Sequence, residues 1–231
     1  MTALPSPYPI VELRRTAVIA GGRPHYARYL ETWCTDQDGH SDSFSYGQFF
    51  ERDHADRFMS LRGYRDLDAR AAVREAAVAR AREEVLQRYT VDSDALLLRP
   101  LHDGAALPAL APVHPGAEPD GAQGLAVAQL LPVAPGALQG CAAAADAWFA
   151  GYQGRGMIEA GILTSLDDAG PAYLVWLGLL RDDAALDALR PQCDACAAAL
   201  AQEGLLDGCP ELIVLTPAPR SRLRWAPRTI A

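Results

Sequence analysis

Apolar residues recur at every second position in several stretches of the chain, a spacing that is typical of half-buried β-strands. In residues 8–20, Val11 and Leu13 share one face, and polar residues occupy the positions between and after them. Two further strands are predicted at 46–50 and 57–64, with a charged turn between them. The first part of the chain therefore begins with three predicted strands.

Two segments show helical spacing instead. Residues 24–36 start with a proline after a glycine pair, and their apolar side chains repeat at helical intervals. Residues 68–88 are rich in alanine and arginine, and acidic residues stand at the positive end of the helix dipole. A fourth strand at 95–99 completes the order β-α-β-β-α-β, which defines a ferredoxin-like unit.

The same order of elements returns in residues 125–231. Between the two units, residues 101–124 are dominated by Pro, Gly and Ala, and we interpret them as an extended linker. The halves align at a nearly constant offset, which places Trp33 on Trp148, Gly21 on Gly136, Phe58 on Tyr173 and Gly63 on Gly178. A slip of one residue in the third strand, which puts Trp176 on Ser60, also fits. We infer a duplication with domains at 1–100 and 125–231.

The composition excludes several classes of function. The 231-residue chain has no lysine, which rules out a Schiff-base mechanism and a P-loop lysine. Its formal net charge of −8 predicts no nucleic-acid partner. No apolar run approaches the ~18–20 residues that cross a bilayer, and the N-terminus does not look like a secretory signal. We therefore expect a cytoplasmic protein with no membrane partner, whose five cysteines are reduced.

Residues 45–76 carry four short motifs in a fixed order. They are Gly47-Gln48-Phe49, Asp56-Arg57-Phe58, Leu61-Arg62-Gly63-Tyr64 and Asp68-Ala69-Arg70. This pattern resembles the NIPSNAP family of the dimeric α/β-barrel superfamily. Members of that superfamily usually cover the open face of the sheet by dimerising, and a fused tandem can do so within one chain. The resemblance therefore implies an α+β fold in which two ferredoxin-like βαββαβ units form a pseudo-dimeric α/β barrel, complete in a monomer. Higher assembly through the outer helices stays open.

Polar residues gather on one predicted sheet face of the first half. We take Glu12, Arg14 and Arg62 as candidate catalytic residues. The candidate substrate-binding residues are Gln48, Tyr64, Thr16 and Trp33. Because unpaired buried charges cost several kcal/mol each, this face forms either a satisfied ion-pair network inside the barrel or a pocket for a small anionic or carbonyl ligand. In a pocket, an arginine would bind the ligand bidentately, and Glu12 would be a general base if burial raises its pKa. The NIPSNAP resemblance also implies an E-x-R pair on the first strand.

The second half lacks this polarity. The offset pairs Glu12 with Val127, Arg14 with Gln129, Thr16 with Leu131, Gln48 with Ile162 or its neighbour, Arg62 with Leu177 and Tyr64 with Leu179. A fused duplicate is free to lose one of two equal sites. We therefore predict a single pocket, with polar groups from the first half and an apolar wall from the second.

Two further motifs have an ordinary structural interpretation beside a chemical one. Cys193 and Cys196 form a CxxC after Pro191, which suits a redox site, but an alanine-rich helix also accepts cysteine as a small apolar residue. The histidines are scattered, without the spacing of a metal site. Some superfamily members bind haem, and His25 or His54 would then be the axial ligand. We predict no cofactor and no metal.

Three classes of function remain open. The first is a small-molecule enzyme without a tightly bound cofactor, like the monooxygenases and isomerases of the superfamily that the chain resembles. The second is a non-catalytic module that binds a ligand or another protein, and the third is a haem-binding barrel. In each case the partner is a small molecule or a protein, and the sequence names neither substrate nor reaction.

Overall fold

The computed structural model describes residues 8–29, 42–81, 88–102, 105, 107, 124–151, 156–166, 171–219 and 221–225. Its strands are β1 (Ile10–Val18), β2 (Ser43–Glu51), β3 (Arg57–Tyr64), β4 (Thr90–Pro100), β5 (Leu125–Val133), β6 (Met157–Ser165), β7 (Ala172–Leu180) and β8 (Glu211–Pro217). Its helices include α2 (Leu67–Ala81), α4 (Leu138–Ala150) and α5 (Asp183–Gln202), and residues 23–29 are also helical. The predicted order of strands and helices is confirmed in both halves.

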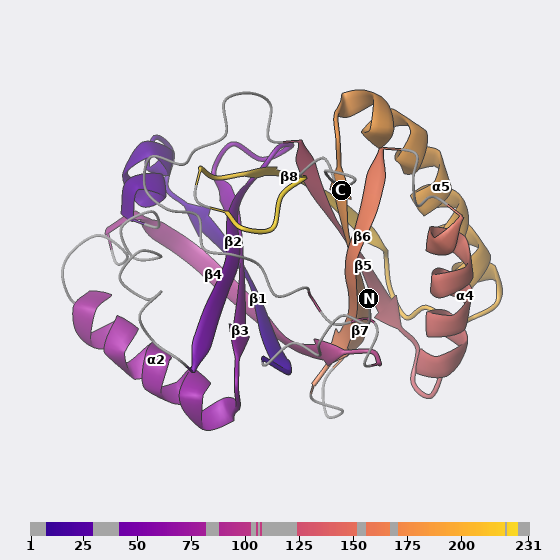
Figure 1. The fold of residues 1–231 in the computed structure, drawn as a ribbon, viewed down its shortest axis with the longest axis horizontal. Coiled ribbons are helices and arrows are strands. Elements are labelled where there is room, and N and C mark those ends of the chain that lie inside the picture. Colours follow the sequence, from indigo (N-terminus) through magenta and orange to yellow (C-terminus); the bar gives the residue numbers. More distant parts are fainter. Residues whose placement is uncertain are drawn as a thin grey trace, which may run out of the picture.

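The strands close into one barrel in the order β1-β3-β2-β8-β5-β7-β6-β4. The first half contributes β4-β1-β3-β2 and the second β8-β5-β7-β6, and short antiparallel ladders join them at β2–β8 and β4–β6. Helix α2 lies on the outside of the first half, and α4 and α5 lie on the outside of the second (Figure 1). The predicted pseudo-dimeric α/β barrel within one chain is therefore confirmed.

The barrel interior is an apolar core shared by both halves. It includes Val11, Leu13, Met59 and Leu61 from the first half and Ala126, Ala128, Val175, Leu177 and Ile213 from the second. Each half would expose its apolar sheet face to water if it stood alone. Closing the barrel buries the two faces against each other, which is a large favourable hydrophobic contribution.

Capping aspartates start both long helices. The Asp66 carboxylate accepts a hydrogen bond from the backbone N–H of Ala69, and Asp182 accepts one from Ala185, at 2.7 Å and 2.9 Å. These acidic helix starts were predicted from the sequence, and the caps satisfy N–H groups that lack a partner within the helix. No helix in the described ranges is long and apolar enough to cross a membrane.

The third strands of the two halves, β3 and β7, align with the one-residue slip rather than with the constant offset. Ser60 pairs with Arg14 and Gln48, and Trp176 pairs with Gln129 and Ile162, so Trp176 stands where Ser60 does. By the same ladders, Arg62 corresponds to Gly178, Tyr64 to Leu180, Phe58 to Leu174 and Gly63 to Leu179. Turn glycines with left-handed backbones, Gly21 and Gly136, follow the first strand of each half at φ of 76° and 77°. The alignment of Trp33 with Trp148 involves a residue outside the described ranges.

The segments that follow the two halves enter the barrel. Ala105 and Leu107, which belong to the predicted linker, are 2% exposed, and Leu107 joins the barrel core. After β8, Leu223 does the same, and Ser221 packs near the backbone of Gly47. At these two positions the segment predicted as a linker packs against the folded chain, with Ala105 in the helix-side cluster of the second half and Leu107 in the barrel core. Residues 221–223 are buried as well.

Candidate functional site

The polar face of the first half lies outside the barrel, on the side of α2. Val11 and Leu13 point into the core, so the alternating side chains of Glu12, Arg14 and Thr16 point the other way. The expectation that these residues line the barrel interior is wrong. Alternation shows which residues share a face, but the closing of the barrel decided that the apolar face turns inward.

Glu12 of β1 is the centre of this face. It is 5% exposed, and its two carboxylate oxygens bind different arginines. Oε1 accepts from Nε of Arg14 at 2.9 Å, and Oε2 accepts from Nε of Arg70 on α2 at 2.6 Å. The side chains of Arg14 and Arg70 are 25% and 16% exposed. The ion pair therefore joins strand to helix in a mostly water-excluded place.

The two arginines set the ionisation of Glu12. Burial by itself would raise the pKa of Glu12, but the charges and hydrogen bonds of Arg14 and Arg70 outweigh it and hold the pKa below its usual value. Glu12 is thus ionised at neutral pH and is a weaker base than an ordinary glutamate. The condition set for a general base, a pKa raised by burial, is not met.

Hydroxyl groups continue the network away from Glu12. Arg14 donates from NH1 to Oγ of Ser93 on β4 at 3.0 Å, and Ser93 lies 3.3 Å from the Thr16 hydroxyl. Tyr26, from the helical residues 23–29, hydrogen-bonds Thr16 and is buried, and that burial raises the pKa of its phenol. Ser93 is exposed, so the network reaches solvent along β4.

The remaining candidates share the same face. Arg62 of β3 lies directly across from Glu12 in the β1–β3 ladder, and Gln48 of β2 lies across from Ser60. Arg62, Gln48 and Tyr64 are 5%, 6% and 2% exposed. Burial, and secondarily the charge of Glu12, raise the pKa of Tyr64 to about 12, so it is a neutral hydrogen-bonding group. Trp33 lies outside the described residues.

Sequence reasoning missed three members of this cluster. Arg70 belongs to the Asp68-Ala69-Arg70 motif, but its role as a partner of Glu12 depends on how α2 lies on the sheet. Ser93 stands on a part of β4 that was not predicted to be strand, because Asp92 and Asp94 interrupt the apolar pattern. Tyr26 was assigned only to the buried face of a helix. Among these three residues, Arg70 alone belonged to a sequence motif that could have indicated a functional role.

An ion-pair network does exist inside the barrel, but different residues form it. Arg15 points inward and binds Glu51 of β2 through Nε and NH2, at 2.8 Å and 2.9 Å. It also binds Glu211 of β8 at 2.8 Å and 3.0 Å. Glu51 is 1% exposed, so this network seals one end of the barrel at the joint between the halves. A cavity of about 40 Å³ beside it is too small for an organic ligand.

The charged turn after β2 docks on the second half. Arg52 donates from its guanidinium to the Asp183 carboxylate at the start of α5, and Asp53 lies 3.9 Å from Arg190. His54 stands in the same turn and borders the small cavity. This turn, which the motif pattern singled out, is therefore a contact between the two halves.

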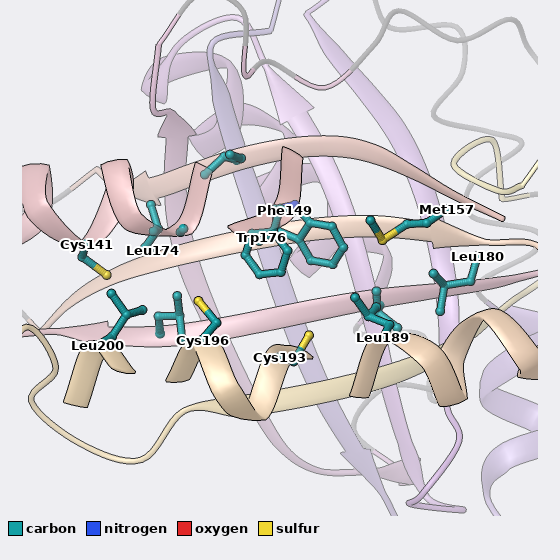
Figure 2. Packing of buried hydrophobic residues seen from close by; sticks show 14 of the residues in the cluster. Cys141, Phe149, Met157, Leu174, Trp176, Leu180, Leu189, Cys193, Cys196 and Leu200 are labelled. Atoms are coloured by element: carbon teal, nitrogen blue, oxygen red, sulfur yellow. The ribbon is translucent and has the colours of Figure 1, made fainter. Parts of the chain in front are cut away.

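The corresponding face of the second half is mostly apolar, although Gln129 is buried in it and Trp176 donates from Nε1 to Glu159 at 3.0 Å. The Trp176 ring stacks on Phe149 of α4, with centroids 4.0 Å apart and planes inclined by 10°. Figure 2 shows this pair between α4 and the strands, together with Leu174, Leu189 and Met157. The predicted asymmetry holds in this sense, but the apolar residues pack under their own helices. They do not form a wall opposite the polar residues of the first half.

The CxxC cysteines belong to this apolar layer. Helix α5 continues through Pro191, and Cys193 and Cys196 face the sheet and α4, where Cys141 lies (Figure 2). Burial raises the pKa of Cys193 to about 12 and those of Cys196 and Cys141 to about 11. A reactive thiol needs the opposite shift, so the geometry favours the packing interpretation.

No family model matches the chain, and no curated protein matches it, but solved structures do. The chain resembles a candidate monooxygenase from Lactobacillus acidophilus NCFM at 12% identity with a TM-score of 0.60, covering 95% of this chain and 100% of that one. A second candidate monooxygenase, from Fusobacterium nucleatum subsp. nucleatum, matches at 10% identity with a TM-score of 0.64, and the match covers 97% of this chain and 99% of that one. An anthrone oxidase-like protein matches at 17% identity with a TM-score of 0.63, and the match covers 90% of both chains. At such identities these similarities show the fold alone, two ferredoxin-like units closed into one barrel.

One solved neighbour, from Thermus thermophilus, is a haem-binding protein at 13% identity and a TM-score of 0.52, with 96% of this chain and 97% of that one covered. Neither histidine named above as a possible axial haem ligand is buried on a helix-side face. His25 is exposed and stacks on Tyr89 with ring centroids 5.0 Å apart, and His54 is exposed in the charged turn. The described part of the chain also holds no group of three or more His, Cys, Asp or Glu side chains suited to a metal ion.

Proposed function

We propose that this chain is a NIPSNAP-like barrel protein that binds a small polar or anionic organic molecule at one site, between the sheet of the first half and α2. The residues assigned to that site are Glu12, Arg14, Arg62, Gln48, Tyr64 and Thr16, joined by Arg70, Ser93 and Tyr26. The NIPSNAP resemblance supports this, because Gln48, Arg62 and Arg70 belong to its motifs and come from three separate elements to one cluster.

The observation that carries the proposal is the contrast between the two helix-side faces. Both halves fold with the same topology, yet the second half fills most of this layer with apolar side chains such as Trp176 and Phe149, and its polar groups there include Gln129 and Glu159, which accepts from Nε1 of Trp176 at 3.0 Å. The fold therefore does not require the arginine–carboxylate network that the first half has beneath its helix. A buried Glu12 held by two arginines costs desolvation, which an apolar layer avoids. We infer that the first half keeps its polar layer for a ligand.

Two candidate roles follow for such a site. The neighbours described as monooxygenases support a small-molecule enzyme, and the NIPSNAP resemblance implies one without a tightly bound cofactor. The ionisation of Glu12 supports a binding module instead, because a carboxylate with a lowered pKa removes protons poorly. If the site is catalytic, Glu12 orients the arginines and another group moves the proton.

A Ser60→Trp variant tests the site directly. Trp176 occupies the matching position in the second half, so the new ring should fill the first half's layer in the same way. We expect small organic acids and amides that bind the unmodified protein, detected by ligand-observed NMR, to lose binding in Ser60→Trp. Ala201→Trp, which adds the same ring on the exposed face of α5, should leave binding intact.

The experiment also separates the two roles. Mass spectrometry of each bound compound after aerobic incubation would reveal turnover if the protein is an enzyme and an unchanged ligand if it is a binding module. Circular dichroism and a thermal melt establish that Ser60→Trp is folded. Should the screen find no binder, or should binding survive in folded Ser60→Trp, the proposal of a first-half site is wrong.

A further inference from the structure

We propose that the free edge of β4 binds an extended basic segment of another protein as an added strand. The edge is formed by the backbone of Ser93 and Ala95, and the bound segment alternates basic with apolar side chains. The side chain of Ser93 belongs to the proposed ligand site, but its backbone does not. The inference therefore goes beyond the proposed function and does not rest on it.

One edge of β4 is paired along the strand, and the other is paired at one end only. The ladder with β1 runs from Thr90 to Leu98, whereas the ladder with β6 begins at Leu98. Just before that ladder, the Leu97 carbonyl accepts from the N–H of Leu166 at 2.8 Å, the residue that follows β6. No described strand pairs with the β6 side of residues 90–96, and residues 91–95 are exposed.

Backbone groups of alternate residues point to this free edge. Because the Leu97 carbonyl faces β6 and the β1 register is unbroken, the N–H and C=O groups of Ala95 and Ser93 face the same way. The N–H of Ser93 accordingly donates to the Asp92 carboxylate at 2.8 Å instead of to a strand. Among the described residues, both groups of Ala95 and the C=O of Ser93 have no hydrogen-bond partner. Such a row of groups is a template for another strand.

The length of β4 is particular to the first half. β8 has the equivalent place in the second half, but it has 7 residues whereas β4 has 11. Leu97 and Val214 hold the same position, because each carbonyl accepts from the first residue after the neighbouring strand. The extra residues of β4 come before that position. Since the joint at β8 forms without them, closing the barrel does not explain them.

An exposed apolar surface adjoins the free edge. Val91, which the bulge opposite Ala17 and Val18 leaves out of the ladder, is 66% exposed. Ile19, whose N–H donates to the carbonyl of Tyr89, is 42% exposed. These are two of the three exposed large hydrophobic side chains in the described part of the chain. Together with the unpaired backbone, they indicate a surface that a partner covers.

Charge decides which partner fits. Asp92 and Asp94 are exposed on one face of the strand, and neither forms an ion pair with a described residue. Arg15 lies across from Asp94 on β1, but Glu51 and Glu211 already bind its guanidinium. An added strand therefore needs basic side chains on this face and small or apolar ones on the other, where Val91 lies.

A second copy of this chain fits the edge poorly. Antiparallel pairing of two β4 edges around Ser93 would place Asp92 of each copy across from Asp94 of the other. Like charges directly opposite each other destabilise a sheet, and charged edges oppose self-association in this way. The same two carboxylates attract a basic segment.

The test titrates the full chain with acetyl-Thr-Lys-Val-Lys-Val-Lys-Thr-amide at low salt. Controls are the same composition in the order Lys-Lys-Lys-Val-Val-Thr-Thr and a version with Glu in place of Lys. We expect the alternating basic peptide to bind, the reordered one roughly 10-fold more weakly, and the acidic one not at all. In NMR hydrogen exchange, binding should protect the N–H groups of Ser93 and Ala95 and leave that of Asp94 unchanged.

Variants separate the backbone contribution from the charge. Ala95→Pro removes an N–H that β1 does not use and should weaken binding roughly 10-fold, whereas Ala95→Val keeps it and should bind normally. Asp92→Asn with Asp94→Asn should weaken binding roughly 3- to 10-fold and reduce its salt dependence. Asp194→Asn with Glu203→Gln, at exposed positions of the second half, is the matched control.

Several results would overturn the inference. They are absent binding of the alternating peptide, equal binding of the reordered one, unchanged binding in folded Ala95→Pro, and unprotected Ser93 and Ala95. A dimer that Ala95→Pro abolishes would assign the edge to a second copy, and protection of both amides without peptide would assign it to another segment of this chain. If Ala95→Pro does not fold, amide protection in the unmodified protein decides. The Ser60→Trp screen tests the proposed function separately.

Discussion

The two halves of the barrel use the same sheet face in opposite ways. In the first half, the face toward α2 carries the Glu12 ion pairs, and in the second, the face toward α4 and α5 carries the Trp176–Phe149 stack. Ladder partners match position for position, with Arg14, Ser60 and Gln48 in one half and Gln129, Trp176 and Ile162 in the other. The topology is therefore indifferent to the polarity of this layer.

This contrast separates what the fold requires from what it permits. Both halves need an apolar inner face, and both have one. The second half gains more stability from its outer layer, where a large cluster of aromatic and aliphatic side chains replaces ion pairs, whereas the first half has a smaller apolar cluster around Val18, Tyr26 and Phe58 there. The first half gives up part of that packing, as expected if the polar residues serve the proposed binding site.

The largest expected effect is in the second half. Trp176→Ala removes a fully buried indole and its stacking partner's contact, and should lower the free energy of unfolding by about 3–5 kcal/mol. Ser60→Ala, at the matching position, removes one hydroxyl and should change it far less. Urea denaturation of both variants measures the difference. Similar losses in the two variants would mean that the halves do not differ in the way proposed.

The second-largest effect on stability is expected at the joint between the two halves, where Arg15 binds Glu51. Arg15→Leu leaves Glu51 buried without its cation, so unfolding should become easier by about 2–3 kcal/mol, less than for a fully buried pair because Arg15 is 22% exposed. Adding Glu51→Leu should recover part of the loss, since no lone charge remains. If the double variant is no more stable than Arg15→Leu, the unpaired charge of Glu51 is not the cause of the lost stability.

A smaller effect on stability is expected at low pH. The pKa of folded Glu12 lies below its ordinary value of 4.5, so its contribution to stability is present above pH 4.5 and is lost as pH falls through the folded pKa. Glu12→Gln should therefore flatten the decline of stability in that range. Glu203→Gln, at an exposed carboxylate, serves as the control and should keep the steep decline. Parallel curves for the protein and Glu12→Gln would contradict the ion-pair geometry.

The smallest effect concerns thiol accessibility rather than stability. Cys209 is exposed, whereas Cys141, Cys193 and Cys196 are buried with raised pKa values. Mapping of iodoacetamide adducts by mass spectrometry at pH 8 should show early modification of Cys209 and modification of the other three only on unfolding. Rapid labelling of Cys193 in the folded protein would support a redox role instead.

Much of the fold was predictable because the strands are short, alternating and separated by strong turn signals. The bounds of β3 agree with the predicted strand at 57–64, and the other strands of the first half differ at their ends. The β4 strand was predicted too short, since Asp92 and Asp94 break the apolar pattern while the backbone still pairs with β1. The buried Leu107 and Leu223 were missed because sequence alone cannot show which tail residues a barrel will admit.

The candidate site was predictable as a set of residues but not as a place. Alternation along β1 and β3 correctly grouped Glu12, Arg14 and Arg62 on one face. It could not identify Arg70 as a partner, because that contact spans 58 residues and depends on the packing of α2. It also overlooked Arg15, which lies on the apolar side of the alternation and still finds two carboxylates inside the barrel.

By itself, the sequence determined the order of elements, the existence of two similar halves, and the loss of polarity in the second. These are local properties, set by hydrophobic period, turn residues and composition. Tertiary structure alone decided which face of the sheet turned inward, because burying two apolar faces against each other is a property of the closed barrel. That closure placed Glu12 under α2 and Arg15 at the joint, and it moved the candidate site from the barrel interior to the layer between sheet and helix.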